Sequence, residues 1–159
     1  MTNNDILRRL RYTLNFDNHA MLNVFTLADR NVDNKELMAW LSKDTDDRYK
    51  SLPDNQLASF LNGLINLKRG KREGPQPEPE AKLNNNLIFR KLKIAFALQS
   101  EDILNILLLA NFKFGAHELS ALFRKADHKH YRPCKDQVLR NFLMGLQLKL
   151  RPDGESSPW

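Results

Sequence analysis

Near its start the chain reads NNDILRRLR, residues 3–11, and it returns to this pattern as NNLIFRKLK, residues 85–93. The match extends outward from these stretches. Residues 3–69 align with residues 85–151 at a constant offset of 82, and 21 of the 67 aligned pairs are identical. An alignment without a gap predicts one structural unit that is used twice.

The apolar spacing within each copy predicts helices. Ile6, Leu7 and Leu10 share one face of a helix at about 100° per residue, and Arg8 and Arg11 lie opposite. Three more helical stripes follow in each copy, and no apolar run alternates with the period of two that indicates a strand. The sequence therefore predicts an all-α fold of two tandem four-helix repeats, packed with pseudo-two-fold symmetry.

Several residues are candidates for helix starts. Asn4 and Asn86 are candidate N-caps, because an asparagine side chain accepts hydrogen bonds from the free amides of a first turn. Asp33 precedes a glutamate at capping-box spacing, which predicts the start of the third helix. Pro53 predicts the start of the fourth helix, where its missing N–H group costs little.

Composition divides the chain into four segments. Three prolines at alternate positions, 75, 77 and 79, block a helix and favour an extended conformation. We expect a helical repeat at residues 1–70, a Pro/Glu-rich linker at 71–84, a second helical repeat at 85–151 and a flexible tail at 152–159.

The net charge of +6 is unevenly distributed. Residues 1–70 carry ten Lys/Arg and nine Asp/Glu, whereas residues 85–159 carry twelve and seven. A basic second half is compatible with an anionic partner such as nucleic acid, and equally with an ordinary soluble protein of high pI. No apolar run is long enough to cross a membrane, and no signal-peptide pattern is present, so we expect a cytoplasmic protein without membrane contact.

Several motifs resemble a known family. They are the Asn-Asn-Asp-Ile-Leu-Arg start, the Phe-Leu-Asn-Gly-Leu-Ile motif at residues 60–65, the Lys-Arg-Gly-Lys motif at 68–71, and the segments 127–134 and 142–146. Together with the duplication and the linker, they are similar to the YehS-like family of small bacterial proteins of unknown function. The resemblance covers nearly the whole chain and implies no catalytic residue. Leu52 stands where the family often has cysteine, which favours a packing role for this position.

Gly63 and Gly145 occupy the same place in the two copies, each inside a helix and after a Phe-Leu pair. Glycine within a helix costs about 0.5–1 kcal/mol relative to alanine, so its retention needs a reason. We expect another backbone to approach closely at these glycines. The approaching element is either the fourth helix of the other copy or a neighbouring helix of the same copy.

The first helix of each copy carries a basic face, which is the best functional candidate in the sequence. Two such faces are suited to the repeated phosphates of a nucleic acid, although solvated helix faces are often basic. No aromatic residues interleave these charges as they do in single-strand binders. The candidate residues for an anionic partner are Arg8, Arg9, Arg11, Arg90, Lys91 and Lys93.

His128, His130 and Cys134 form the densest group of potential metal ligands, with donor atoms that zinc prefers. Their spacing matches no standard zinc motif, and the first copy has Asp46, Arg48 and Leu52 at these places. A structural or solvated loop is therefore the favoured interpretation. No orienting residue accompanies Cys134, so the sequence indicates no catalytic residue, no metal and no cofactor.

The sequence favours a non-enzymatic helical binding module that binds nucleic acid or another anionic partner through the basic faces. The alternative is a protein–protein adaptor that uses a groove between the repeats. A metal-binding protein or an enzyme without a recognisable motif is a weaker alternative. The sequence does not indicate the oligomeric state.

Overall fold

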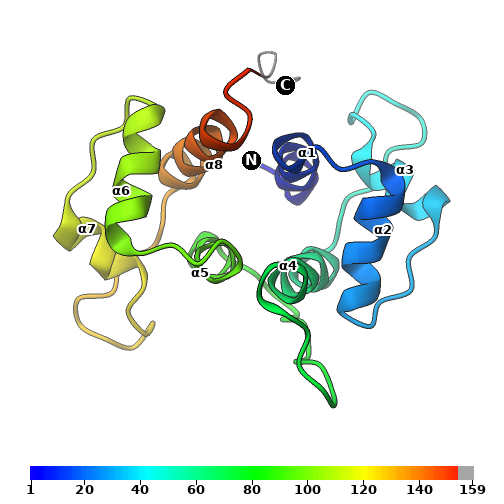
Figure 1. Ribbon diagram of the computed structural model, residues 1–159, viewed down its shortest axis with the longest axis horizontal. Coiled ribbons are helices and arrows are strands. Elements are labelled where there is room, and N and C mark those ends of the chain that lie inside the picture. Colours follow the sequence, from blue (N-terminus) through cyan, green and yellow to red (C-terminus); the bar gives the residue numbers. More distant parts are fainter. Residues whose placement is uncertain (154–159) are drawn as a thin grey trace. The chain divides into compact units, whose positions relative to one another are not determined.

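The computed structural model describes residues 1–153 of the chain, and all regular secondary structure in that range is α-helical (Figure 1). The helices are α1 (Asn3–Leu14), α2 (Asn18–Leu27), α3 (Asn34–Leu41), α4 (Asp54–Arg69), α5 (Asn85–Ala95), α6 (Ser100–Leu109), α7 (Ala116–Leu122) and α8 (Asp136–Leu150). They form two compact units, of which the first is Met1–Leu83 and the second begins at Asn84. We call them unit 1 and unit 2.

Each unit contains the same succession of four helices, so the predicted tandem four-helix repeat is confirmed. In unit 1 the most extensive helix packing joins α2 to α4, and in unit 2 it joins the equivalent pair, α6 and α8. The fourth helix of unit 1 begins directly after Pro53, as predicted. The expected pseudo-two-fold packing of the repeats stays a prediction.

The core of each unit is built from the stripes that the sequence predicts. Ile6, Leu7 and Leu10 of α1 are buried, as are their counterparts on α5. Full burial of such a side chain stabilises the fold by about 1.5–3 kcal/mol. The first helix of each unit is therefore fixed by its apolar face.

A leucine and a phenylalanine occupy swapped positions in the cores of the two units. Unit 1 has Leu7 on α1 and Phe25 on α2, whereas unit 2 has Phe89 on α5 and Leu107 on α6. All four side chains are fully buried. The phenylalanine contacts the aromatic ring of the fourth helix in both units, at centroid distances of 5.3 Å for Phe25 and 4.5 Å for Phe89. Paired exchange keeps the core volume, which is the kind of change that a packed interior tolerates.

The helix glycines lie where two helices touch. A Cβ atom built on Gly63 would lie 1.9 Å from the carbonyl oxygen of Val24 on α2, and one built on Gly145 would lie 2.0 Å from that of Ile106 on α6. No side chain fits at such a distance, so only glycine lets α4 and α8 approach their neighbours. The predicted close approach is confirmed, and the approaching backbone is the second helix of the same unit.

The predicted N-caps of the first helices are wrong. Thr2 caps α1, because its side chain accepts the Asp5 amide, and Asn84 caps α5. Asn4 and Asn86 lie inside the helices and are buried, with 2% and 9% of their surfaces exposed. Both asparagines instead hold a distant loop, as described below.

Between α4 and α5 the chain has no helix, and this segment contacts other parts of unit 1 at both of its ends. Lys71 forms an ion pair of 2.7 Å with Asp29, and the backbone amide of Leu83 donates to a carboxylate oxygen of Asp54. The predicted tail at 152–159 lies mostly outside the described residues. Within residues 1–153 no helix has the length and apolar character needed to span a membrane.

Candidate functional site

A buried asparagine fixes the loop that joins the third and fourth helices of unit 1. We call residues 42–53 the first loop. The Asn4 side-chain amide donates to the carbonyl oxygens of Trp40, at 3.0 Å, and Lys50, at 2.8 Å. The Leu52 amide donates to the side-chain oxygen of Asn4 at 3.0 Å. One side chain of α1 therefore satisfies three backbone groups on both sides of the loop.

Unit 2 repeats this arrangement at residues 124–135, which we call the second loop. The Asn86 side-chain amide donates to the carbonyl oxygens of Leu122 and Arg132, at 3.0 and 2.9 Å. The Cys134 amide donates to the Asn86 side-chain oxygen at 2.9 Å. The second loop is therefore held by the same three hydrogen bonds as the first.

The backbones of the two loops also form matching hydrogen bonds, both within the loop and to the helix that precedes it. The Lys50 amide donates to the carbonyl oxygen of Ala39, and the Arg132 amide donates to that of Ala121, both at 3.1 Å. Two tighter turns within each loop repeat at the same positions. The two loops are therefore one backbone structure with different side chains.

Those side chains differ most in charge. The first loop contains three Lys/Arg and three Asp/Glu, so its formal charge is zero. The second loop contains five Lys/Arg and a single aspartate, so its formal charge is +4 with neutral histidines. Its basic residues are all exposed, and they are Arg124, Lys125, Lys129, Arg132 and Lys135. Most of the difference in net charge between the two repeats thus lies in one loop.

An ion pair in the first loop is replaced by a pair of histidines in the second. Asp46 accepts two hydrogen bonds from the Arg48 guanidinium, at 2.9 and 3.1 Å, and one from the Arg48 backbone amide. These bonds lower the pKa of Asp46 to about 2. At the equivalent positions, His128 and His130 have ring centroids 5.5 Å apart, and the His130 amide donates to His128 Nδ1 at 3.0 Å.

Two predicted residues of α5 reach the beginning of the second loop. The Arg90 guanidinium donates to the carbonyl oxygen of Phe123 at 2.9 Å, and the Lys93 ammonium lies 4.9 Å from the centre of the Phe123 ring. Phe123 immediately precedes Arg124 in the chain. The structure therefore joins part of the predicted basic face of α5 to a larger basic surface that the sequence analysis did not identify.

The basic face of α1 is arranged differently. Arg8 forms an ion pair with Asp5 at 2.5 Å and donates to the carbonyl oxygen of Ser42. Leu87 occupies the place of Asp5 in unit 2, so Arg90 has no equivalent ion pair within its helix. The prediction that Arg9 belongs to an outer basic face is wrong, because only 7% of its surface is exposed.

The remaining two predicted residues are half-buried. Arg11 of α1 lies close to Asn18 of α2, at 3.5 Å between its guanidinium and the amide oxygen, and Lys91 lies on α5 beside Arg90. Neither residue lies in a loop, and Arg11 belongs to the unit whose loop has no net charge. Of the six candidates, Arg90 and Lys93 are therefore the pair that the structure ties to a concentrated basic surface.

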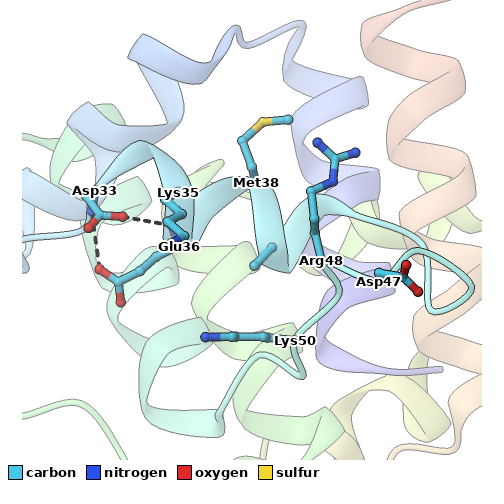
Figure 2. Close-up of a pocket in the computed structure, with 8 residues that line it drawn as sticks. Asp33, Lys35, Glu36, Met38, Asp47, Arg48 and Lys50 are labelled. Atoms are coloured by element: carbon cyan, nitrogen blue, oxygen red, sulfur yellow. Dashed lines mark hydrogen bonds between the residues drawn. The ribbon is translucent and has the colours of Figure 1, made fainter.

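Unit 1 contains a pocket of about 530 Å³ between α3 and the first loop (Figure 2). Figure 2 shows Lys50 along one side of it, with Met38 and Arg48 on the opposite side. The pocket is charge-balanced, and two of its acidic groups already serve the capping box of α3. Its charged lining residues are Lys35, Arg48, Lys50, Asp33, Glu36 and Asp47. This balance favours neither an anion nor a cation.

The candidate metal ligands do not converge. His128 and His130 are exposed, whereas Cys134 is buried and its thiol lies 3.6 Å from the carbonyl oxygen of Lys135. Burial raises the pKa of the Cys134 thiol to about 12, which keeps it protonated at neutral pH. Within residues 1–153 no three His, Cys, Asp or Glu side chains are grouped to hold a metal ion. Cys134 packs where Leu52 packs in unit 1.

The excess positive charge of the second loop can be read from the duplicated sequence. A residue-by-residue comparison of the two copies at the offset of 82 replaces Asp44, Asp46 and Asp47 by alanine, histidine and lysine. The overlooked signal was a local change of charge at aligned positions.

The model of one protein family matches the chain at residues 3–70 and 85–151, and its description is "Protein of unknown function (DUF1456)". The chain is 44% identical over 147 residues to the "Uncharacterized protein YehS" of Escherichia coli (strain K12), a match that covers 92% of this chain and 94% of the relative. No solved structure matches the chain. The two matched segments coincide with the two four-helix repeats.

Proposed function

The chain belongs to the DUF1456 family, and from its own side chains we propose that it is a helical binding module for a phosphate-bearing polymer, with nucleic acid as the expected partner. The binding surface is the second loop together with Arg90 and Lys93 of α5. We call this set the basic loop surface. The proposal assigns no reaction to the protein, and it includes the expected cytoplasmic location.

One observation carries the proposal. The same loop backbone is held in the same way in both units, yet its formal charge is zero in unit 1 and +4 in unit 2. A fold that needs only the loop backbone does not require five exposed cations in one copy. A concentrated excess of positive charge is the electrostatic feature that attracts phosphates.

The contacts of α5 support a fixed surface. Arg90 and Lys93 both contact Phe123, so their charges are held beside the first residue of the loop. Asn86 anchors the other end through Arg132 and Cys134. Cations held in place lose less conformational entropy on binding than cations on a mobile segment.

The formal charge of +4 on the second loop sets the expected response to salt. Neutralising about four phosphates on duplex DNA gives a slope of about −3.6 for log K against log salt concentration. Between about 50 and 200 mM salt the affinity should therefore fall by about two orders of magnitude. A measurement of this slope counts the phosphates that the surface engages.

A pair of matched variants tests the location. Lys125→Asp and Lys43→Asp change an exposed lysine at equivalent loop positions, and both lower the net charge of the protein by the same amount. We expect Lys125→Asp to weaken binding of a labelled DNA duplex by about tenfold or more in fluorescence anisotropy, since it removes a phosphate contact and adds repulsion. Lys43→Asp should change it by less than about threefold, through long-range charge alone.

The outcomes separate three cases. A large effect confined to Lys125→Asp supports the basic loop surface. Equal weakening by both variants would show that net charge alone governs binding. Absence of binding to duplex and single-stranded DNA and to RNA at about 50 mM salt would refute the proposed function.

A protein partner is the second candidate function, and exposed apolar residues favour it. Among the large apolar side chains of the described chain that are at least 40% exposed, four lie on α6 and α8, and they are Leu108, Leu109, Leu148 and Leu150. Such side chains contribute to protein interfaces when they gather in one patch. A partner captured through them would bind with little dependence on salt, whereas phosphate binding weakens steeply. Leu108→Ser with Leu109→Ser should abolish the first kind of binding and leave the second unchanged.

A further inference from the structure

We infer that anion binding at the second loop is coupled to proton uptake by His128 and His130, so that the affinity for a phosphate polymer rises in mildly acidic solution. The inference rests on the proposed function and adds a form of regulation to the same surface. It starts from the histidine pair, which the proposed function leaves without a role.

In the first loop, the turn equivalent to that of the histidine pair is formed by Asp46 and Arg48, and it does not respond to pH near neutrality. Asp46 and Arg48 form a doubly hydrogen-bonded ion pair, and the Asp46 carboxylate also accepts the backbone amide of Arg48 at 2.8 Å. The pKa of Asp46 is lowered to about 2, and a guanidinium stays charged at all ordinary pH values. The turn in unit 1 therefore keeps both its charge and its hydrogen bond across the physiological range.

The second loop makes the same turn with a titratable acceptor. The backbone amide of His130 donates to Nδ1 of His128 at 3.0 Å. A ring nitrogen accepts a hydrogen bond only when it carries no proton, so this turn is built on a neutral imidazole. Imidazole is the side chain that ordinarily changes its charge between about pH 5 and 8.

Protonation of the pair changes charge and structure together. Each proton adds one positive charge, and a proton on Nδ1 of His128 removes the acceptor of the His130 amide. Both rings are exposed, and their centroids are 5.5 Å apart, so two charged rings repel each other.

The charges on the loop and on the neighbouring helices are mostly positive. The loop itself carries Asp127 as its single acid. On α7, Glu118 accepts the backbone amide of Gly115, and His117 is a further titratable group. The cations on the loop and on α5 are Arg124, Lys125, Lys129, Arg132, Lys135, Arg90 and Lys93.

A bound phosphate adds negative charge beside the two imidazoles. Its negative charge stabilises the protonated imidazoles and screens their repulsion from the neighbouring cations. The complex therefore holds more protons than the free protein at the same pH. By linkage, binding takes up protons, and affinity increases as the pH falls through the range in which the histidines titrate.

The chain itself supplies the matched control. The double substitution His128→Asp with His130→Arg installs the pair of the first loop on an equivalent backbone and leaves the formal loop charge at +4. A thymine-only single strand without a terminal phosphate is a suitable probe, because neither its bases nor its phosphodiesters change charge between about pH 5.5 and 8. Binding is measured by anisotropy, and proton uptake is measured by calorimetry in buffers of different ionisation enthalpy.

For the natural chain we expect affinity to rise by about tenfold from about pH 8 to about pH 5.5, with up to two protons taken up for each bound strand. The double variant should bind at both pH values, and its affinity should change by less than about threefold between them. Any remaining change would come from His19 and His117, which the variant keeps. Binding by both proteins with the same pH dependence would overturn the inference and leave the proposed function standing. Absence of binding at every pH would overturn both.

A second measurement needs no ligand. In the natural chain, the NMR signal of the His130 amide should shift when the His128 ring titrates, because the two groups are hydrogen-bonded. In the double variant the amide of residue 130 should not respond between about pH 8 and 5.5. If the His130 amide signal did not shift while the His128 ring titrates in the natural chain, the proposed link between protonation and the loop hydrogen bond would be refuted.

Discussion

The two loops of this protein separate what the fold needs from what a surface can vary. Both are held by a buried asparagine of the first helix, and both form the same backbone hydrogen bonds. Yet one carries balanced charge and a fixed ion pair, whereas the other carries an excess of four positive charges and two histidines. The comparison teaches that both copies of the fold keep the asparagine and the helix glycine, whereas the loop side chains and their charge can differ between the copies.

The same distinction applies inside the core. A leucine and a phenylalanine change places between the first and second helices of the two units without leaving the interior. Packing therefore specifies total volume more strictly than it specifies each residue. The glycine at the helix crossing permits no such exchange, because a backbone oxygen occupies the space of its side chain.

The largest expected loss of stability tests whether the two helix glycines can be replaced. Gly63→Ala and Gly145→Ala should each lower the free energy of unfolding by about 3 kcal/mol or more, because the new methyl group meets a backbone carbonyl. Urea denaturation measures the loss, and hydrogen exchange locates it in the unit that carries the change. A stabilised variant in either unit would contradict the close packing of the helices.

The next effect tests whether the two asparagines are equivalent. Asn4→Ala and Asn86→Ala should each cost about 2–4 kcal/mol, because backbone groups near Leu52 and Cys134 lose a partner in a buried setting. Urea denaturation should give similar values for both. Hydrogen exchange in the affected loop should accelerate, and unequal losses would mean that the two anchors are not energetically alike.

A smaller effect concerns the end of the first helix. Asn15 and Ala97 occupy equivalent places with left-handed φ angles of 55° and 51°. Asparagine tolerates this conformation, whereas alanine is strained in it. Ala97→Asn should therefore raise the free energy of unfolding by about 0.5–1 kcal/mol, and Asn15→Ala should lower it by a similar amount. Thermal unfolding of both variants checks the prediction, and a loss on Ala97→Asn would contradict it.

The smallest effect at neutral pH is expected for Cys134→Leu, which copies Leu52 into unit 2. Burial raises the pKa of the Cys134 thiol from an ordinary value of 9.0 to about 12. Above about pH 9 the unfolded chain loses this proton while the folded chain keeps it, so stability of the natural chain falls as the pH rises. The leucine variant should lack that fall in urea denaturation at about pH 10. An identical alkaline loss in both proteins would exclude the thiol as its cause.

Much of the fold follows from the sequence, because helical periodicity and duplication support each other. Gly63 and Gly145 were identified from their context alone, since glycine inside a helix has a measurable cost. Asn4 and Asn86 were assigned to the wrong role. An asparagine near a helix start resembles a cap, and only the folded chain brings a loop some 36 to 48 residues away to its side chain.

The candidate site was predicted in part. Arg90 and Lys93 lie at the basic loop surface, whereas Arg9 is buried, which helical periodicity alone does not reveal for a residue at the flank of a stripe. The contribution of the second loop was missed because loops have no periodicity that marks their exposed side chains. Comparing aligned loops for charge would have recovered it.

The asparagine anchor has a consequence for protein engineering and for evolution. Asn4 and Asn86 each bind two carbonyl oxygens and one amide of the main chain, and Asn4 also accepts a hydrogen bond from the Tyr49 hydroxyl at 3.3 Å. The main-chain part of this anchor does not depend on which side chains the loop presents, apart from the buried residue at position 52 or 134. We therefore expect the exposed side chains of residues 43–48 and 125–130 to tolerate replacement without any change in the helices that carry the loops.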